Sequence, residues 1–240
     1  MPGVGPDDED DVIRAVLLDF YGTVVADDDS IVDAICEEVR IACPEPDRVR
    51  SHEVGDFWWR LFCQEAGDST ASTFRLQRDM AVSSLADTVR HFGSMANPHD
   101  LCERQFMYWR QPELFPDTRS FLGTVGLPVC IVSDIDRPDV EAAINHHRLP
   151  LAMVLTSEDV RCYKPGAAIF ERSLQLLGLR SDEVVHIGNS LSADIAGAHG
   201  AGIPAIWINR SGRARPDPFT AIADVPTLSE ALPVLQRIRA

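Results

Sequence analysis

The residues of this sequence that could do covalent chemistry follow short apolar runs. Asp19 comes directly after "AVLL", and Thr23 follows it in the turn "FYGT". Ser133 and Asp134 end the run "LPVCIVSD", and Lys164 comes later in "CYKPG". Because the carboxyl ends of parallel strands meet at one crevice in an open α/β sheet, we expect these side chains to lie close together.

A further apolar run adds polar groups to the same predicted crevice. The segment "VVHIGNS" ends on Asn189 and Ser190, and Asp194 follows shortly after it. Any one of these residues alone is typical of a turn or a helix cap. Several apolar runs that all end on such residues indicate a functional site instead.

The residue types predict nucleophilic catalysis by a carboxylate. Asp19 can attack an electrophilic carbon or phosphorus and form an ester or acyl phosphate that water then cleaves. An ammonium group such as Lys164 within reach would favour the ionised form of Asp19. The hydroxyl groups of Thr23 and Ser133 are donors for the negative charge that develops during the reaction.

The pattern of elements predicts an α/β fold, a doubly wound Rossmann-like parallel sheet with a helical insertion after the first strand. Continuous apolar runs are typical of strands buried on both faces, and helical patterns alternate with them. The expected strands lie at 15–19, 127–134, 151–157, 184–190 and 203–209. Residues 30–112 show only helical spacing, so we expect them to close over the carboxyl edge of the sheet. The predicted units are a disordered acidic leader (1–11), a core (12–29 and 113–240) and the helical segment (30–112).

Composition restricts the partners. The 240 residues carry 22 Lys and Arg against 37 Asp and Glu, which gives a net charge of −15. This charge repels phosphate backbones and anionic lipids, so we expect a small-molecule substrate and neither a nucleic-acid nor a membrane partner. The six cysteines form no CxxC pair, which is typical of reduced thiols in a cytoplasmic protein. No apolar run approaches the roughly 20 residues that span a bilayer.

The order of these motifs resembles the haloacid dehalogenase superfamily. Its motif one resembles "LLDFYGTVV", motif two "IVSD", motif three "CYKPG" and motif four "HIGNSLSADIAGAHGAG". The resemblance covers residues 14 to about 235. It implies that Asp19 is the nucleophile, that Lys164 and Asp194 complete the catalytic set, and that residues 30–112 form the mobile cap of many members. It also implies a possible homodimer through the helical insertion, which no residue pattern here decides.

Motif one resembles most closely that of the 2-haloacid dehalogenases, which share the form "DFYGT". The segment "WWRLFCQ" resembles the place where those enzymes hold an arginine that binds the substrate and contacts the halide, which would be Arg60. Tyr21 stands where the phosphatases of the superfamily hold an acid that protonates the leaving alkoxide. Because a halide leaves without a proton, and a tyrosine with a pKa near ~10 is a weak acid, Tyr21 favours a carbon–halogen substrate.

Other positions favour the phosphatases. Asp134 stands where dehalogenases hold an Asn that contacts the substrate carboxylate, and it would repel that group unless it points away or pairs with Arg137. Gly188-Asn189-Ser190 resembles the Gly-Asp-Ser of phosphatases more than the motif of dehalogenases. The resemblance implies no metal for a dehalogenase. A phosphatase would bind Mg²⁺, for which the possible ligands are Asp19, the Tyr21 carbonyl, Asn189 and Asp194.

Three hypotheses follow for the function. The first is a 2-haloacid dehalogenase-like hydrolase that works through a covalent Asp19 intermediate. The second is a Mg²⁺-dependent phosphatase or phosphonatase-type hydrolase of a small phosphorylated metabolite. The third is a catalytically weak relative that acts as a binding protein. In each of them Tyr21, Arg60, Asp134, Asn189 and Ser190 are the candidate substrate-binding residues.

Overall fold

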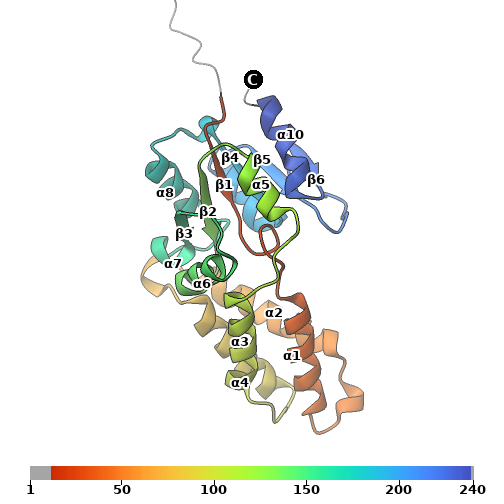
Figure 1. Cartoon of the computed structure of the whole chain (residues 1–240). Helices are drawn as coiled ribbons and strands as arrows, with labels where there is room; N and C mark the ends of the chain where they lie inside the picture. The colour runs from red at the N-terminus through yellow and green to blue at the C-terminus, as the bar shows by residue number, and fades with distance from the viewer. Residues whose placement is uncertain (1–11, 239–240) are drawn as a thin grey trace, which may run out of the picture.

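The core of the protein is a six-stranded parallel sheet, seen in a computed structural model that describes residues 12–238 (Figure 1). The strand order is β3-β2-β1-β4-β5-β6, so β1 lies between β2 and β4. The strands are β1 (Ala15–Leu18), β2 (Val129–Ser133), β3 (Met153–Thr156), β4 (Val184–Gly188), β5 (Ala205–Ile208) and β6 (Ala223–Val225). This doubly wound α/β sheet confirms the predicted fold class.

Helices cover both faces of the sheet because alternate residues of each strand point to opposite sides. From β1, Ala15 and Leu17 pack with Ile169 and Phe170, whereas Val16 and Leu18 pack with a second group that includes Phe121. The helices of the core are α5 (Thr118–Thr124), α6 (Arg137–His147), α7 (Ser157–Val160), α8 (Ala167–Leu177), α9 (Ala196–Gly200) and α10 (Leu228–Ile238).

Four longer helices lie between β1 and α5 in the chain and form a bundle beside the carboxyl ends of the strands (Figure 1). They are α1 (Asp29–Ile41), α2 (Ser51–Asp68), α3 (Gln77–His91) and α4 (Pro98–Arg110). Each buries one face; in α1 the buried residues Ile35, Cys36 and Val39 recur at helical spacing. The predicted helical segment 30–112 therefore contains helices and no named strand among the described residues.

Some predictions from the sequence are not tested by the structure, and others differ from it. The acidic leader at 1–11 lies outside the described residues, and the division into core and cap stays a prediction. The sixth strand, β6, was not predicted, because three residues at a sheet edge are too short to show a period. A short π-helical turn (Leu191–Ile195) precedes α9 in the segment that follows β4.

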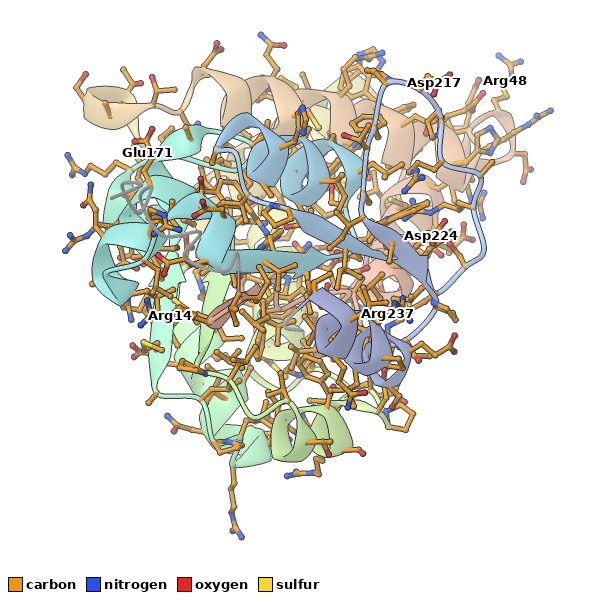
Figure 2. All side chains as sticks on the ribbon, turned by 90° about the horizontal axis from the view of Figure 1, so that it is seen from above. Arg14, Arg48, Glu171, Asp217, Asp224 and Arg237 are labelled. Carbon is orange, nitrogen blue, oxygen red and sulfur yellow. The ribbon has the colours of Figure 1, made fainter. Side chains whose placement is uncertain are left out.

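The surface is charged, as the composition indicates. Figure 2 shows the labelled side chains of Arg48, Glu171 and Asp217 at the periphery of the molecule, directed away from the sheet. Within residues 12–238, none of the helices combines the length and the apolar character that crossing a membrane requires.

Two aspartates connect the helical bundle to the core: Asp136 lies directly before α6, and Asp139 lies within it. Asp136 accepts hydrogen bonds from the backbone N–H groups of Gln77 and Arg78, at 2.9 and 3.0 Å, and so caps the N-terminus of α3. Asp139 is fully buried and binds the Arg78 guanidinium through both oxygens at 2.6 Å. Arg110, the last residue of α4, donates to the same carboxylate at 2.9 Å. This contact fixes the bundle over the edge of the sheet where the candidate site lies.

We expect Arg78→Met to destabilise the fold, because it leaves the buried Asp139 carboxylate with Arg110 as its remaining ion-pair partner. The expected loss in the free energy of unfolding is about 2–3 kcal/mol, below that of a fully isolated buried charge. Urea denaturation measures it.

The matched control for this prediction is Arg90→Met on the same helix, where the ion pair with Asp87 is exposed. Breaking an exposed pair should change the urea midpoint little. Equal midpoints for the two variants would contradict the role given to Asp139.

Candidate active site

The centre of the candidate site is the Lys164 ammonium, which lies between two carboxylates. Its Nζ donates to Asp19 Oδ1 and to Asp194 Oδ1, both at 2.7 Å, and lies 3.3 Å from the Val132 carbonyl oxygen. Lys164 is 8% exposed, Asp19 6% and Asp194 1%. β1 and β4 are adjacent in the sheet, so the residues that follow them converge on the same ammonium.

Burial and mutual repulsion set the protonation of the two acids. Burial and the Asp194 charge raise the pKa of Asp19 to about 7, although Lys164 and Thr23 act in the opposite direction. Burial alone would raise the pKa of Asp194, but Lys164 and His186 hold it below its ordinary value. Burial alone would lower the pKa of Lys164, but Asp19 and Asp194 keep it above the ordinary value. Lys164 therefore favours the ionised form of Asp19, as predicted, yet it does not outweigh burial and Asp194 together.

Asp194 is positioned by the end of β4. Its Oδ2 accepts the backbone N–H of Ser190 at 2.9 Å, and its Oδ1 lies 3.0 Å from His186 Nε2. A Cβ at position 188 would lie 2.3 Å from the Asp194 carboxyl carbon, so only a glycine there lets the side chain fold back against the strand. Burial lowers the pKa of His186, which favours a neutral imidazole.

The loop after β1 places a hydroxyl group beside the second oxygen of Asp19. Thr23 Oγ1 donates to Asp19 Oδ2 at 2.9 Å and is fully buried. The turn between them depends on Gly22, whose φ of +83° is strained for residues with a Cβ. Ser133 lies at the end of β2, also buried, and its Oγ accepts the backbone N–H of Ile135 at 3.3 Å.

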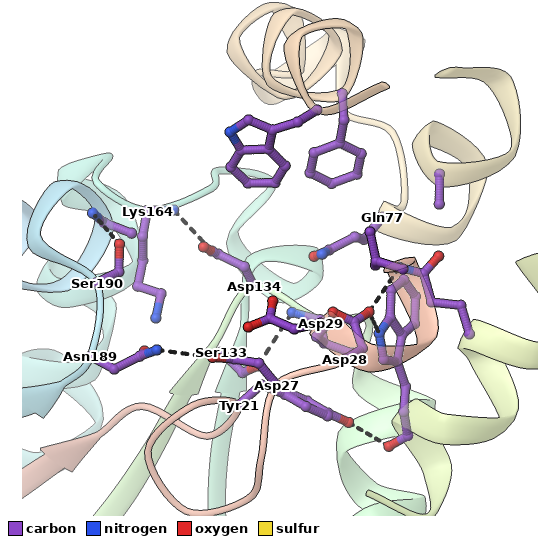
Figure 3. A pocket seen from close by; sticks show the side chains of 18 of the residues that line it. Tyr21, Asp27, Asp28, Asp29, Gln77, Ser133, Asp134, Lys164, Asn189 and Ser190 are labelled. Atoms are coloured by element: carbon purple, nitrogen blue, oxygen red, sulfur yellow. Dashed lines mark hydrogen bonds between the residues drawn. The ribbon is translucent and has the colours of Figure 1, made fainter. Parts of the chain in front are cut away.

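Tyr21 lies in the same loop, but its hydroxyl group is bound to the helical bundle. It donates to the Trp109 carbonyl oxygen at 2.6 Å, as Figure 3 shows. Burial raises the pKa of Tyr21 well above its ordinary value, and Asp139 and Asp28 add to the shift. The hydroxyl is therefore a structural donor and a very weak acid.

Asp134 is held by groups other than the one expected. Its Oδ1 accepts from the Lys164 backbone N–H at 2.9 Å and from the Ser157 hydroxyl at 2.5 Å. The suggested partner Arg137 pairs instead with Asp159 and Glu141. Burial raises the pKa of Asp134. The Asp134 carboxyl group thus holds the backbone of Lys164 in place.

The arrangement does not match the predicted Mg²⁺ ligands. Both Asp194 oxygens accept N–H groups, and Asn189 turns its amide nitrogen toward Asp27 Oδ2 at 3.3 Å. Within the part of the chain that the structure describes, no three His, Cys, Asp or Glu side chains are grouped to hold a metal ion. The set of Asp19, the Tyr21 carbonyl, Asn189 and Asp194 therefore does not fit Mg²⁺ as arranged here.

A cavity of about 590 Å³ opens above Asp19 and Lys164, between the sheet edge and the helical bundle. The candidate residues that line it are Asp19, Tyr21, Ser133, Asp134, Lys164, Asn189, Ser190 and Asp194. Aromatic residues of the segment "FWWRLF" line it as well, namely Trp58, Trp59 and Phe62. The expected substrate-binding residue Arg60 is not among the lining residues. It is exposed on α2, with its guanidinium 4.8 Å from the centre of the Phe57 ring. It faces away because helix α2 turns by about 100° per residue, so Trp58 and Arg60 point in different directions.

Sequence reasoning missed several residues that line the cavity or position its walls. Asp27 and Asp28 are not among the predicted site residues, and both line the cavity. Asp28 Oδ2 accepts from Trp109 Nε1 at 2.7 Å and from Gln105 Nε2 at 2.8 Å, so the loop and α4 form one wall. The run "DDDS" was the available signal. Adjacent carboxylates repel one another, so their grouping at the end of a loop indicates a function.

Comparison with known proteins assigns the family. A model of the haloacid dehalogenase-like hydrolase family matches residues 13–202, so the chain belongs to this family of hydrolases. An (S)-2-haloacid dehalogenase of Pseudomonas sp. (strain YL) is 26% identical, over 84% of this chain and 85% of that relative.

Phosphatases match as well. A phosphoserine phosphatase of Thermus thermophilus is 30% identical over 50% of this chain, which spans about half of that protein, 51%. Among solved structures, an L-2-haloacid dehalogenase of Xanthobacter autotrophicus superposes with a TM-score of 0.73 at 20% identity, over 95% of this chain and 100% of that one. The comparisons therefore give a hydrolase of this family, with relatives of both kinds.

We expect the activity to rise with pH through about 7, because burial and Asp194 raise the pKa of Asp19, the predicted nucleophile, to that value. Below this pH the Asp19 carboxyl is protonated and cannot attack; above it the carboxylate is ionised. The dependence of kcat/KM on pH measures this acid limb. An acid limb near the ordinary carboxyl value of about 4 would contradict the electrostatic description of the site.

Proposed function

We propose that this hydrolase cleaves a carbon–halogen bond of a small molecule through an ester on Asp19, as a 2-haloacid dehalogenase-like enzyme. One observation carries the proposal. The residue two places after the nucleophile is a tyrosine whose hydroxyl group is committed to the Trp109 carbonyl at 2.6 Å. No acid from this position can protonate a leaving alkoxide, whereas a halide needs no proton to leave.

The proposed reaction has two steps, and each uses groups already in place. In the first, an oxygen of Asp19 bonds to the substrate carbon while the carbon–halogen bond breaks and the halide leaves with the electron pair. In the second, water adds to the carboxyl carbon of the ester and loses a proton to solvent. The bond between the carboxyl carbon and the oxygen that carries the substrate carbon then breaks. That oxygen takes up a proton from solvent and leaves as the alcohol, and the Asp19 carboxyl group is restored.

The donors around Asp19 support the second step. Lys164 Nζ and Thr23 Oγ1 each donate to one carboxyl oxygen, at 2.7 and 2.9 Å. As water adds to the ester, negative charge develops on an oxygen of Asp19, and a fixed donor beside it lowers the barrier. Because both donors are buried, little reorganisation is needed during the reaction.

Hydrolysis of a phosphate ester is the second candidate, and Asp27 is the observation that favours it. Partial burial and the neighbouring Asp29 and Asp28 raise the pKa of Asp27 to about 6. Asp27 lines the cavity beside Asn189, so a protonated Asp27 could supply the proton that Tyr21 does not. In this reaction water attacks phosphorus instead of the Asp19 carboxyl carbon.

A single turnover in H₂¹⁸O with enzyme in excess separates the two candidates. With 2-chloropropionate as the first halogenated test compound, the proposal expects ¹⁸O in the peptide that contains Asp19 and none in the alcohol product. With p-nitrophenyl phosphate, the second candidate expects ¹⁸O in phosphate and none in the peptide. Mass spectrometry of the digested protein and of the product gives the answer.

Asp19→Asn should abolish halide release while leaving the thermal unfolding midpoint close to that of the parent. The nucleophile is lost, but an acid whose pKa burial raises to about 7 adds no stability in its charged form near neutral pH. The control is Asp224→Asn, the same change at an exposed position on the edge strand (Figure 2). Retained turnover in the Asp19 variant would rule out the covalent intermediate.

Tyr21→Phe should leave turnover nearly unchanged, because the proposal gives the hydroxyl a structural role. Loss of a general acid would instead lower the rate by ~10²–10⁴-fold. The lost hydrogen bond to Trp109 should reduce the free energy of unfolding by about 1 kcal/mol. Steady-state kinetics and urea denaturation of the same sample measure the two effects.

A further inference from the structure

We propose that the acidic and aromatic wall of the cavity binds an organic cation, so that the non-reacting end of the substrate is an alkylammonium group and not a carboxylate. This inference rests on the proposed function only for the reacting end of the substrate. The cation-binding wall is made of Asp27 and Asp28 from the loop before α1, of Asp29 at the start of α1, and of α2 and α4 side chains described below.

The charges that face the cavity are almost all negative. Asp27, Asp28 and Asp29 line it, together with Asp56 of α2. Among the described lining residues the lone Lys or Arg is Lys164, which is already shared by Asp19 and Asp194. An anionic substrate end would therefore meet repulsion from the wall, whereas a cation would be attracted.

A buried amide gives a second, independent indication. Gln105 of α4 lines the cavity and is 7% exposed, and its Nε2 donates to Asp28 Oδ2 at 2.8 Å. Because a carboxylate only accepts, this contact fixes which end of the amide faces Asp28. Gln105 Oε1 then has no hydrogen-bond partner within residues 12–238. A buried acceptor without a partner is costly, and a donor on the ligand would satisfy it.

A further side-chain amide, whose oxygen has no hydrogen-bond partner among the described residues, lines the cavity. Gln77, at the start of α3, lines the cavity, and its Oε1 is likewise buried and unpaired in the described structure. Figure 3 shows its side chain between the helical bundle and Asp134. The polar groups remote from Asp19 thus offer acceptors, which suits a ligand rich in N–H or polarised C–H donors.

Aromatic rings complete the wall. Trp58, Trp59, Phe62 and Trp109 all line the cavity. Trp109 is oriented by its Nε1, which donates to Asp28 Oδ2 at 2.7 Å. The face of an indole ring attracts an alkylammonium group by about 0.5–2 kcal/mol, more where water is excluded. Carboxylates and aromatic faces together favour an organic cation over a small inorganic one.

Among the described residues that line the cavity there is no arginine, the side chain that pairs best with a carboxylate. Arg60 is exposed on the outside of α2 and does not line the cavity. Arg213 lines a separate hollow beside Asn189 and Ser190, and its charge partly offsets the rise in the pKa values of Asp27 and Asp29. Partial burial and neighbouring carboxylates raise the pKa values of Asp27 and Asp29, and a bound cation would relieve that repulsion.

Isothermal titration of the full chain with three small probes tests the inference without any turnover. The probes are choline, its uncharged isostere 3,3-dimethylbutan-1-ol, and propionate. We expect choline to bind about tenfold more tightly than the isostere, which corresponds to about 1.4 kcal/mol, and propionate to be the weakest. Equal affinities for choline and the isostere, or tighter binding of propionate, would overturn the inference.

Two variants locate the binding. Asp28→Asn keeps the shape and one acceptor, and should weaken choline at least fivefold while leaving the isostere unchanged. Trp59→Leu, at a ring that is 66% exposed, keeps apolar area without an aromatic face and should also weaken choline selectively. Asp224→Asn is the control and should change neither affinity. Choline binding that neither variant affects would place it elsewhere and overturn the inference.

Turnover then separates this inference from the proposed function. Formation of choline from (2-chloroethyl)trimethylammonium, faster than lactate from 2-chloropropionate, supports both. Selective choline binding without hydrolysis of either chloride supports the inference and contradicts the proposed function. Faster hydrolysis of 2-chloropropionate supports the proposed function and overturns the inference.

Discussion

The structure depends on a buried ammonium group shared by two carboxylates. Taking the charges of Lys164, Asp19 and Asp194 out of water costs several kcal/mol each, so the arrangement is tolerable only with short, well-directed contacts. The 2.7 Å distances from Lys164 Nζ to both acids meet that condition. The strand order supplies them, because β1 lies directly beside β4 and the two acids follow those strands. The charge arrangement therefore depends on the doubly wound topology, which brings the two acids to the same ammonium group.

The same arrangement leaves a surplus of negative charge, and that surplus helps to raise the pKa of Asp19. One ammonium cannot neutralise two acids and also offset burial, so the pKa of Asp19 rises while that of Asp194 falls. The helical bundle strengthens the effect by covering the site. The attachment of the bundle through Asp136 and Asp139 determines how far the site is closed to water. The ion pair between Arg78 and Asp139 therefore affects the pKa of Asp19 through the position of the bundle.

The sequence predicted the fold class and the residues at the strand ends well, because both follow from local signals. Buried runs ending on Asp19 and Ser133 can be read without knowing what packs on them. Arg60, which the resemblance suggested for substrate binding, does not line the cavity, because a similar local segment does not determine which side of a helix faces a cavity. The partners of Asp134 and Tyr21 come from segments far away in the chain, and only the tertiary structure shows them.

Tyr21 connects the chemistry at one end of the cavity with recognition at the other. Its ring follows the nucleophile in the β1 loop, and its hydroxyl holds the carbonyl of Trp109 on α4. The same Trp109 donates its indole N–H to Asp28, which also receives Gln105. Replacing an acid by tyrosine at this position therefore does two things at once. It removes a proton donor from the proposed reaction, and it ties the loop after Asp19 to helix α4, which forms one wall of the cavity. A chain with an acid at position 21 would need another anchor for α4, so the choice of leaving group and the shape of the binding wall are coupled through one side chain.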